Sequence, residues 1–276
     1  MATSVAWPGL FGSLGGFAHL TLMRFVTDSG IEVPIVTTEQ MREIDRIAVD
    51  ETGPNLFQMM ENAGRNLALQ AMELLGAKWN RASMIVLAGG GGNGGGGICA
   101  ARHLANRGLD VTLCLSEPHR LRSVVEFQRK IFSSTQGREI SLVDLSRQTP
   151  DFIVDALIGY GLASAPTGLT AELIQWANHS GAPILSLDVP SGIDSTTGHT
   201  PGDFIVAQCT MTLALPKSGL VPDKAGDLVL ADIGVPRMTF ERAGVPHASP
   251  FDNRFRVPLI RHEISSGFGS EQCGAE

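Results

Sequence analysis

The chain has 276 residues, of which 43% are hydrophobic and 18% are charged, and its formal net charge is −7. Intrinsic disorder requires lower hydrophobicity and higher charge, and a negative chain is a poor partner for nucleic acid, whose phosphates need a basic surface. The four cysteines have no Cys-x-x-Cys spacing, so we expect neither a zinc site nor a redox dithiol. We expect the protein to work in a reducing, cytoplasmic environment.

Residues 1–36 differ from the rest of the chain. Residues 7–23 are apolar but interrupted by Pro and Gly, and no Lys or Arg precedes Arg24. The run therefore lacks the basic start of a secretory signal, and it is too short and too rich in glycine for a membrane-spanning helix. We expect no membrane association. Residues 1–36 are expected to form a flexible extension, and the alternative is that the true start of the protein is Met23.

From residue 37 the chain alternates between helix and strand patterns. Thr37 followed by Gln40 is typical of a capping box that opens a helix. A second helix is expected from about Asn55 to Gly76, and others over 98–106, over 123–133 and from Thr170. Expected strands cover 84–88, 111–115, 140–145, 152–158, 183–187, 205–215 and 228–233.

This alternation predicts parallel βαβ units in a sheet that is covered on both faces. After Pro236 the periodicity fades, so we expect one domain over 37–236 and an irregular tail over 237–276. Three distinctive loops, 89–97, 159–165 and 188–192, each follow a predicted strand. Ligands of such sheets bind outside the carboxyl ends of the strands, so the three loops predict one common site.

The first loop places eight glycines around Asn93. Such a backbone allows amides to approach a ligand closely, and amides at a helix N-terminus favour a phosphate or pyrophosphate. The tract matches G-x-G-x-x-G trivially, and a flexible linker is the alternative interpretation. No Gly-Lys-Ser/Thr ending follows, which disfavours a P-loop nucleotidase.

Two aspartates end predicted strands next to the other loops. Asp155 and Asp188 can each bind a metal ion, transfer a proton or cap a turn, and their shared edge favours a functional role. In the segment Asp188–Asp194, Pro190 and Gly192 hold Ser191 in a tight turn. No G-x-S-x-G elbow surrounds Ser191, so a nucleophilic role is disfavoured.

Six motifs together resemble the YjeF N-terminal domain family. They are MENAGR from Met60, VLAGGGGNGGGG from Val86, DALIGYGL from Asp155, LDVPSGID from Leu187, LALPKSGL from Leu213 and LADIGVP from Leu230. The resemblance covers about 37–236. It implies a Rossmann-like three-layer α/β/α sandwich with a mainly parallel central sheet, in agreement with the pattern of elements.

The resemblance also implies an activity, NAD(P)H-hydrate epimerase, which interconverts the R and S epimers of hydrated NADH and NADPH for repair. It implies Asp188 as the catalytic residue and a potassium ion held by Asn93, Asp155 and Ser191. Substrate contacts implied by motif position are Gly92, Asn93, Gly94, Gly95, Gly96, Gly159, Tyr160, Gly161, Leu162, Ala163, Ser164, Ala165 and Asp188. The family also implies a homodimer and an S-specific dehydratase as pathway partner, here a separate chain because 237–276 is too short to hold one.

The chain departs from the family loop GPGNNGGDG at Gly90, Gly92 and Gly96. The loss of Asp at position 96 removes a carboxylate next to the substrate, and the added glycines loosen the loop. A weakened domain that binds a nucleotide or a protein is therefore an alternative function. A plain NAD-dependent dehydrogenase is disfavoured, because Glu117 is the only acid near the end of the second strand that could hold a ribose.

Overall fold

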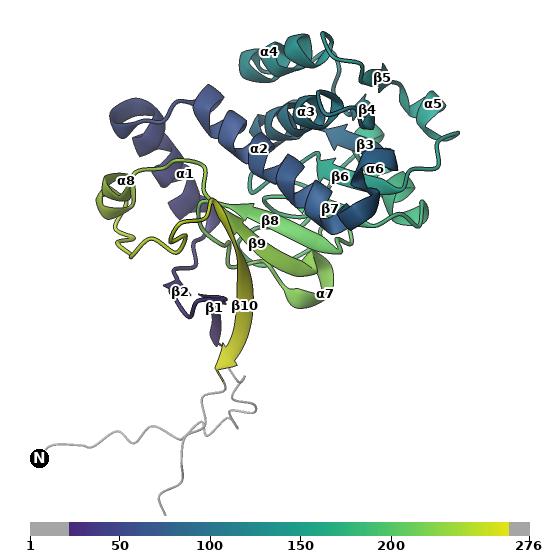
Figure 1. The fold of residues 1–276 in the computed structure, drawn as a ribbon. Coiled ribbons are helices and arrows are strands. Elements are labelled where there is room, and N and C mark those ends of the chain that lie inside the picture. The colour runs from purple at the N-terminus through teal and green to yellow at the C-terminus, as the bar shows by residue number, and fades with distance from the viewer. Residues whose placement is uncertain (1–21, 265–276) are drawn as a thin grey trace, which may run out of the picture.

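A ten-stranded sheet with the order β2-β1-β10-β9-β8-β7-β6-β3-β4-β5 forms the centre of the protein (Figure 1). The structure is a computed structural model that describes residues 22–264. In chain order its elements are β1 (Leu22–Thr27), β2 (Glu32–Val33), α1 (Thr38–Ile47), η1 (Ala48–Thr52, a π-helical turn), α2 (Leu56–Leu75), η2 (Gly76–Arg81, a 3₁₀ helix), β3 (Ser83–Ala88), α3 (Gly92–Ala105), β4 (Asp110–Leu115), α4 (Ser123–Phe132), β5 (Arg138–Ile140), α5 (Leu142–Leu145), β6 (Phe152–Ala156), α6 (Gly168–His179), β7 (Ile184–Leu187), β8 (Cys209–Leu213), α7 (Pro222–Ala225), β9 (Asp227–Ala231), α8 (Arg237–Arg242) and β10 (Arg256–Ile264). Within 22–264 no helix combines the length and the apolar character needed to cross a membrane.

The seven strands from β9 to β5 are parallel. From β3 the chain passes outward through β4 to the edge strand β5, and it then returns to place β6 on the other side of β3. The strand order therefore reverses between β3 and β6. Parallel sheets bind ligands at such a switch point, and here the segments after Ala88 and Ala156 flank it.

Both faces of the sheet are buried, as the sequence predicts. Along β3, Met84, Val86 and Ala88 pack with residues of α2, α3 and α4, whereas Ile85 and Leu87 pack with residues of α5 and α6. Figure 1 shows α2, α3 and α4 together above the sheet. The predicted three-layer α/β/α sandwich with a mainly parallel sheet is confirmed.

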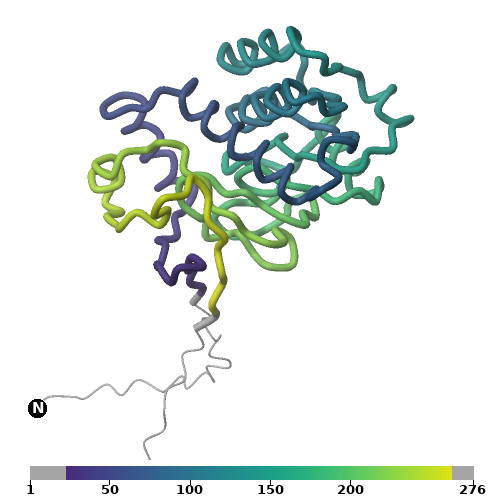
Figure 2. Tube along the Cα trace, in the orientation of Figure 1, coloured from purple at the N-terminus to yellow at the C-terminus, as the bar shows by residue number. Residues whose placement is uncertain are grey.

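The two ends of the described chain extend this sheet, which corrects two expectations. Residues 22–33, placed by sequence in a flexible extension, form β1 and β2, and 256–264, placed in an irregular tail, form β10. β10 pairs antiparallel with both β9 and β1, so the two ends of the described chain run side by side (Figure 2). Residues 1–21 and 265–276, covered by the same expectations, lie outside the described residues.

Local boundaries also differ from the predicted ones. α3 begins at Gly92 rather than near Ile98, so most of the glycine tract is helix and only 89–91 is loop. A Cβ at Gly97 would lie 2.4 Å from the Ala156 Cβ, so the glycines allow the start of α3 to approach β6 closely. The segment 140–145 ends β5 and then forms α5, capped by the Ser141 side chain, rather than a strand.

Candidate active site

A cavity of about 480 Å³ opens at the switch point, over the carboxyl ends of β3, β6 and β7. Helices α1 and α2 contribute its other wall. Its charged lining residues are Arg42, Asp45, Arg122 and Asp188, and the rest of its lining is Leu56, Met59, Met60, Ala63, Gly91, Gly92, Asn93, Gly96, Leu157, Ile158, Gly159, Tyr160, Gly161, Leu187, Leu213 and Ile233. The cavity is thus largely apolar with a few polar groups, as small-molecule sites commonly are.

Gly159 brings the predicted residues of the first two loops next to Asp188. A Cβ at Gly159 would lie 3.0 Å from the Asn93 Oδ1 atom and 3.0 Å from the Asp188 Oδ2 atom. The amide and the carboxylate therefore flank this glycine from two sides. The buried Nδ2 atom of Asn93 has no hydrogen-bond partner among the described residues, so it is available to a ligand.

Asp155 and Ser191 form a fully buried cluster that contains oxygen acceptors and neutral donors. The Asp155 Oδ1 atom accepts hydrogen bonds from the Ser191 hydroxyl at 2.5 Å and from Leu157 N at 3.2 Å. Its Oδ2 atom accepts from the Ser186 hydroxyl at 2.8 Å and from Ser191 N at 2.9 Å. Burial raises the pKa of Asp155 despite these four bonds. No basic side chain among residues 22–264 forms an ion pair with this carboxylate.

Asp188, in contrast, is paired with a buried lysine. The Lys217 ammonium donates to the Asp188 Oδ1 atom and, at 2.8 Å, to the Leu213 carbonyl oxygen, and both side chains are almost fully buried. Asp188 has a φ angle of 69°, a left-handed conformation that is costly for a residue with a Cβ. Its Oδ2 atom remains at the cavity, where it accepts from Tyr160 N at 3.0 Å.

Seven predicted site residues line the cavity: Gly92, Asn93, Gly96, Gly159, Tyr160, Gly161 and Asp188. Gly94 and Gly95 are buried inside α3, and Asp155 and Ser191 lie behind the cavity wall. The predicted substrate residues Leu162, Ala163, Ser164 and Ala165 are not among the lining residues. The structure thus brings the strand-end residues together but not the second half of the loop 159–165.

Four polar residues near the cavity escaped sequence analysis: Arg42, Asp45, Arg122 and Lys217. Lys217 lies inside the apolar segment LALPKSGL, and a lysine in such a segment is itself a signal of a buried charge that needs a partner. Asp45 interrupts the apolar stripe formed by Met41 and Ile44 of α1 and continued by Ala48, the first residue of η1. Each signal could have been found by asking which charges occur on faces expected to be buried.

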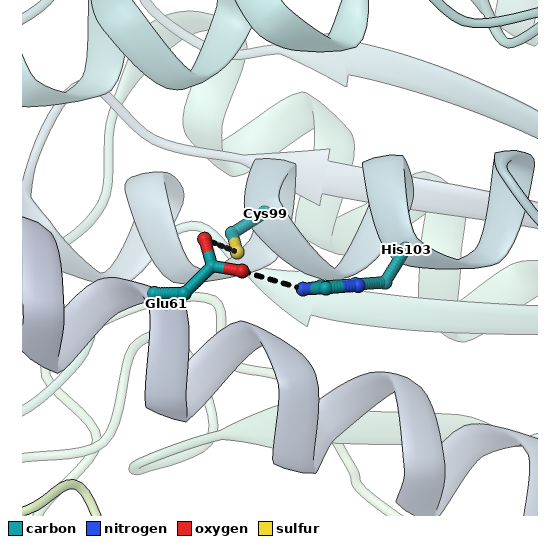
Figure 3. Close-up of side chains that lie close together, drawn as sticks. All are labelled: Glu61, Cys99 and His103. Atoms are coloured by element: carbon teal, nitrogen blue, oxygen red, sulfur yellow. Dashed lines mark hydrogen bonds and ion pairs between the residues drawn. The ribbon is translucent and has the colours of Figure 1, made fainter.

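A second polar cluster lies between α2 and α3. The Glu61 carboxylate accepts from Arg102 at 2.5 Å and contacts the His103 Nε2 atom at 2.9 Å and the Cys99 thiol at 3.4 Å (Figure 3). Carboxylate, thiolate and imidazole are metal ligands, and their atoms lie within 4.8 Å of one another. However, the Arg102 guanidinium already supplies the positive charge there, and burial raises the pKa of Cys99 to about 12, so the thiol stays protonated.

Comparison with known proteins decides the family. The family model described as YjeF-related protein N-terminus matches residues 56–219. The chain belongs to this family. It is 48% identical to a protein named NAD(P)H-hydrate epimerase from Dehalogenimonas lykanthroporepellens, over 87% of this chain and 99% of that protein.

Other relatives of the chain are longer proteins. The chain is 39% identical to the bifunctional NAD(P)H-hydrate repair enzyme Nnr of Hyperthermus butylicus, over 67% of this chain but only 35% of Nnr. It is 30% identical to the human enhancer of mRNA-decapping protein 3, over 87% of this chain and 47% of that protein. The crystal structure of yeast ynu0 has the same fold, with a TM-score of 0.71 and 21% identity over 82% of this chain and all of the yeast chain.

Proposed function

We propose that this protein is an NAD(P)H-hydrate epimerase, which interconverts the R and S forms of NADH and NADPH hydrated at C6 of the nicotinamide ring. The 48% identity to a protein of that name, over nearly its whole length, is the observation that carries the proposal. The position of Asp188 at a cavity built from the family motifs supports it. Arg42 and Arg122 on the cavity wall match the negative charge of the pyrophosphate, and the N-terminus of α3 favours the same group.

The chemistry needs proton transfer to and from an oxygen atom. The hydrated ring carries its hydroxyl on the carbon next to nitrogen, whose lone pair can expel that hydroxyl once it is protonated. Water then returns to the other face of the iminium carbon, and the configuration is inverted. The Asp188 Oδ2 atom would move one proton in this sequence, while Lys217 holds the Oδ1 atom and fixes the side chain.

The proposal includes a potassium ion held by Asp155, Ser191 and Asn93. The donor set fits, since it consists of carboxylate, hydroxyl and amide oxygens, the hard ligands that such a cation takes. A buried carboxylate without a basic partner also gains from a nearby positive charge. The ion would supply that charge and tie the segment after β6 to the segment after β7, where Ile158 N donates to the Ser191 hydroxyl at 2.8 Å.

The proposed function also has a pathway partner, a compartment and an oligomeric state. A separate S-specific dehydratase would complete the repair, and the protein would act in the cytoplasm. A homodimer is supported by apolar side chains that α2 leaves exposed: Leu56, Phe57, Leu69 and Leu74.

A binding module without catalysis is the second candidate, and two observations favour it. Glycine replaces the family residues at positions 90, 92 and 96, and the relatives include the enhancer of mRNA-decapping protein 3. Such a module would bind a nucleotide or a protein and would not convert the hydrate.

The deciding experiment measures conversion of R-NADHX in potassium buffer, coupled to excess S-specific dehydratase. We expect a rate well above spontaneous epimerisation, and a lower rate when sodium replaces potassium. A rate equal to the background, together with nucleotide binding, would favour the binding module instead.

A further inference from the structure

Asp45 places a second carboxylate at the cavity, on a different element from Asp188. It lies on α1 and lines the cavity. Its Oδ2 atom accepts a hydrogen bond of 2.5 Å from the Tyr160 hydroxyl, while the backbone N of Tyr160 donates to the Asp188 Oδ2 atom at 3.0 Å. One tyrosine is therefore hydrogen-bonded to both carboxylates.

Packing does not account for an acid at position 45. Its neighbours are buried and apolar: Met41 and Ile44 on α1, and Ala48 at the start of η1. Within residues 22–264 no basic side chain forms an ion pair with Asp45. Burial raises the pKa of Asp45 above its ordinary value, and the Asp188 charge acts in the same direction, against the Tyr160 hydrogen bond and the Lys217 charge. Burial also raises the pKa of Tyr160, so its hydroxyl remains a donor.

Inversion at C6 makes a demand that one carboxylate does not meet. The hydroxyl leaves from one face of the ring and water enters from the other, so a proton must be given on one face and taken on the other. Within the described residues, Asp45 and Asp188 are the two acids that line the cavity.

We propose that Asp45 is a second catalytic residue of the proposed epimerase, which transfers the proton on the ring face opposite to that served by Asp188. In one direction a protonated carboxyl gives its proton to the C6 hydroxyl, the C6–O bond breaks and water leaves as nitrogen forms the iminium bond. Water then attacks the other face, the electron pair returns to nitrogen, and the second carboxylate takes the surplus proton. The roles exchange in the reverse direction, no redox step occurs, and solvent restores the protons between turnovers.

This inference rests on the proposed function, and isotope exchange separates the two. In H₂¹⁸O each ionisation followed by addition of water labels C6, whichever face the water enters. We would follow label uptake and inversion for each pure epimer, subtracting the spontaneous rates. The Asp45→Asn variant, of nearly the same volume, should lose inversion by about 10²-fold. From one epimer it should still take up label with retained configuration, because Asp188 can both expel the hydroxyl and return water on its own face.

The controls guard against a merely structural effect. Glu39→Gln neutralises an exposed acid of the same helix and should leave both rates unchanged. Tyr160→Phe keeps both carboxylates and removes only the hydroxyl that orients Asp45, so it should lower the ratio of inversion to exchange by a smaller factor. This second variant tests the inference even if Asp45→Asn does not fold.

Two results would overturn the assignment of Asp45. One is that exchange and inversion fall equally in both Asp45→Asn and Tyr160→Phe. The other is that neither rate falls in either variant. A wild-type protein that catalyses neither process would instead overturn the proposed function, and this inference with it.

Discussion

Two polar clusters of this protein look alike as ligand sets but differ in charge. The strand-end cluster, Asp155 with Ser186 and Ser191, is fully buried and contains a carboxylate with neutral donors only. The interhelical cluster, Glu61 with Cys99, Arg102 and His103, is partly exposed and contains its own cation, whose Nη2 atom lies 2.5 Å from the Glu61 carboxylate. Ligand atoms close together thus do not by themselves define a metal site, because a resident guanidinium satisfies the same charge.

The two clusters are also expected to differ in role, the strand-end cluster serving function and the interhelical cluster serving stability. The strand-end cluster stands at the switch point of the sheet, behind the cavity that holds Asp188. The interhelical cluster joins α2 to α3, where a partly exposed ion pair contributes little. We therefore expect substitutions at the strand ends to change catalysis and cation dependence, and substitutions between the helices to change stability slightly.

The largest effect is expected from Asp188→Asn. Loss of the proton-transferring carboxylate should lower kcat/KM by about 10²–10⁴-fold in the coupled assay. The variant also leaves Lys217 buried without a charge partner, which costs about 3–5 kcal/mol. The double variant Asp188→Asn/Lys217→Met should recover much of that stability in urea unfolding but none of the activity. Full turnover by a folded single variant would remove Asp188 from the mechanism.

The next effect tests the cation at the strand-end cluster. Asp155→Asn replaces one carboxylate oxygen by an amide donor that faces Ser186 and Ser191, and should lower the free energy of unfolding by about 1–3 kcal/mol. Wild-type protein should melt at a higher temperature in potassium than in sodium at equal ionic strength, because a ligand of the folded state stabilises it. The variant should melt at the same temperature in both salts. A wild-type protein indifferent to the two salts would argue against the ion.

A smaller effect is expected at Gly96, which lies on α3 and lines the cavity. Gly96→Asp restores the acid of the family loop, and a hydrogen bond to substrate hydroxyls of about 0.5–1.5 kcal/mol should lower KM two- to tenfold. The new Cβ would lie 2.8 Å from the Leu187 Cδ2 atom, the movable end of a side chain. Gly96→Ala is the matched control, since it adds the Cβ without the carboxylate, and it should not lower KM. Equal values for both variants would mean that position 96 acts through packing alone.

The smallest effect is expected from Glu61→Gln. Burial opposes the charge of Glu61, but hydrogen bonds from Arg102 and Cys99 and the Arg102 charge outweigh it and hold the pKa of Glu61 below its ordinary value. Folding is therefore stabilised above a pH of about 4.3, the pKa of an unfolded Glu, and this contribution is lost as pH falls through the lower folded pKa. The variant should lose at most about 1 kcal/mol at neutral pH, keep its activity, and approach wild type on acidification. A large loss of activity would contradict the division between the clusters.

Much of the fold could be predicted because it depends on short-range patterns. Apolar runs marked the parallel strands, and the capping box at Thr37 marked α1. β1 and β10 were missed because their partners lie at opposite ends of the chain, and β10 carries Arg, Pro and His within its nine residues. The start of α3 was missed because glycine disfavours helix locally, whereas tight packing against β6 decides the outcome here.

The candidate site was predictable only where residues follow strands. Asp155 and Asp188 each follow a buried apolar run, and parallel topology brings such positions to one edge. Lys217 and Asp45 reach the same region from a loop and from a helix, and no spacing rule connects them to Asp188. Lys217 reaches Asp188 directly, and Asp45 reaches the same region through Tyr160, so both contacts depend on tertiary packing.

The most direct test of the central claim follows the approach to equilibrium without any coupling enzyme. Pure R-NADHX and pure S-NADHX would be incubated separately with the protein in potassium buffer, and the two epimers resolved by chromatography over time. An epimerase should drive both samples to the same mixture, faster than the spontaneous rate and with no other product, and Asp188→Asn should do so at least about 10²-fold more slowly. If the folded wild-type protein leaves both R-NADHX and S-NADHX to interconvert at the spontaneous rate, the account is contradicted.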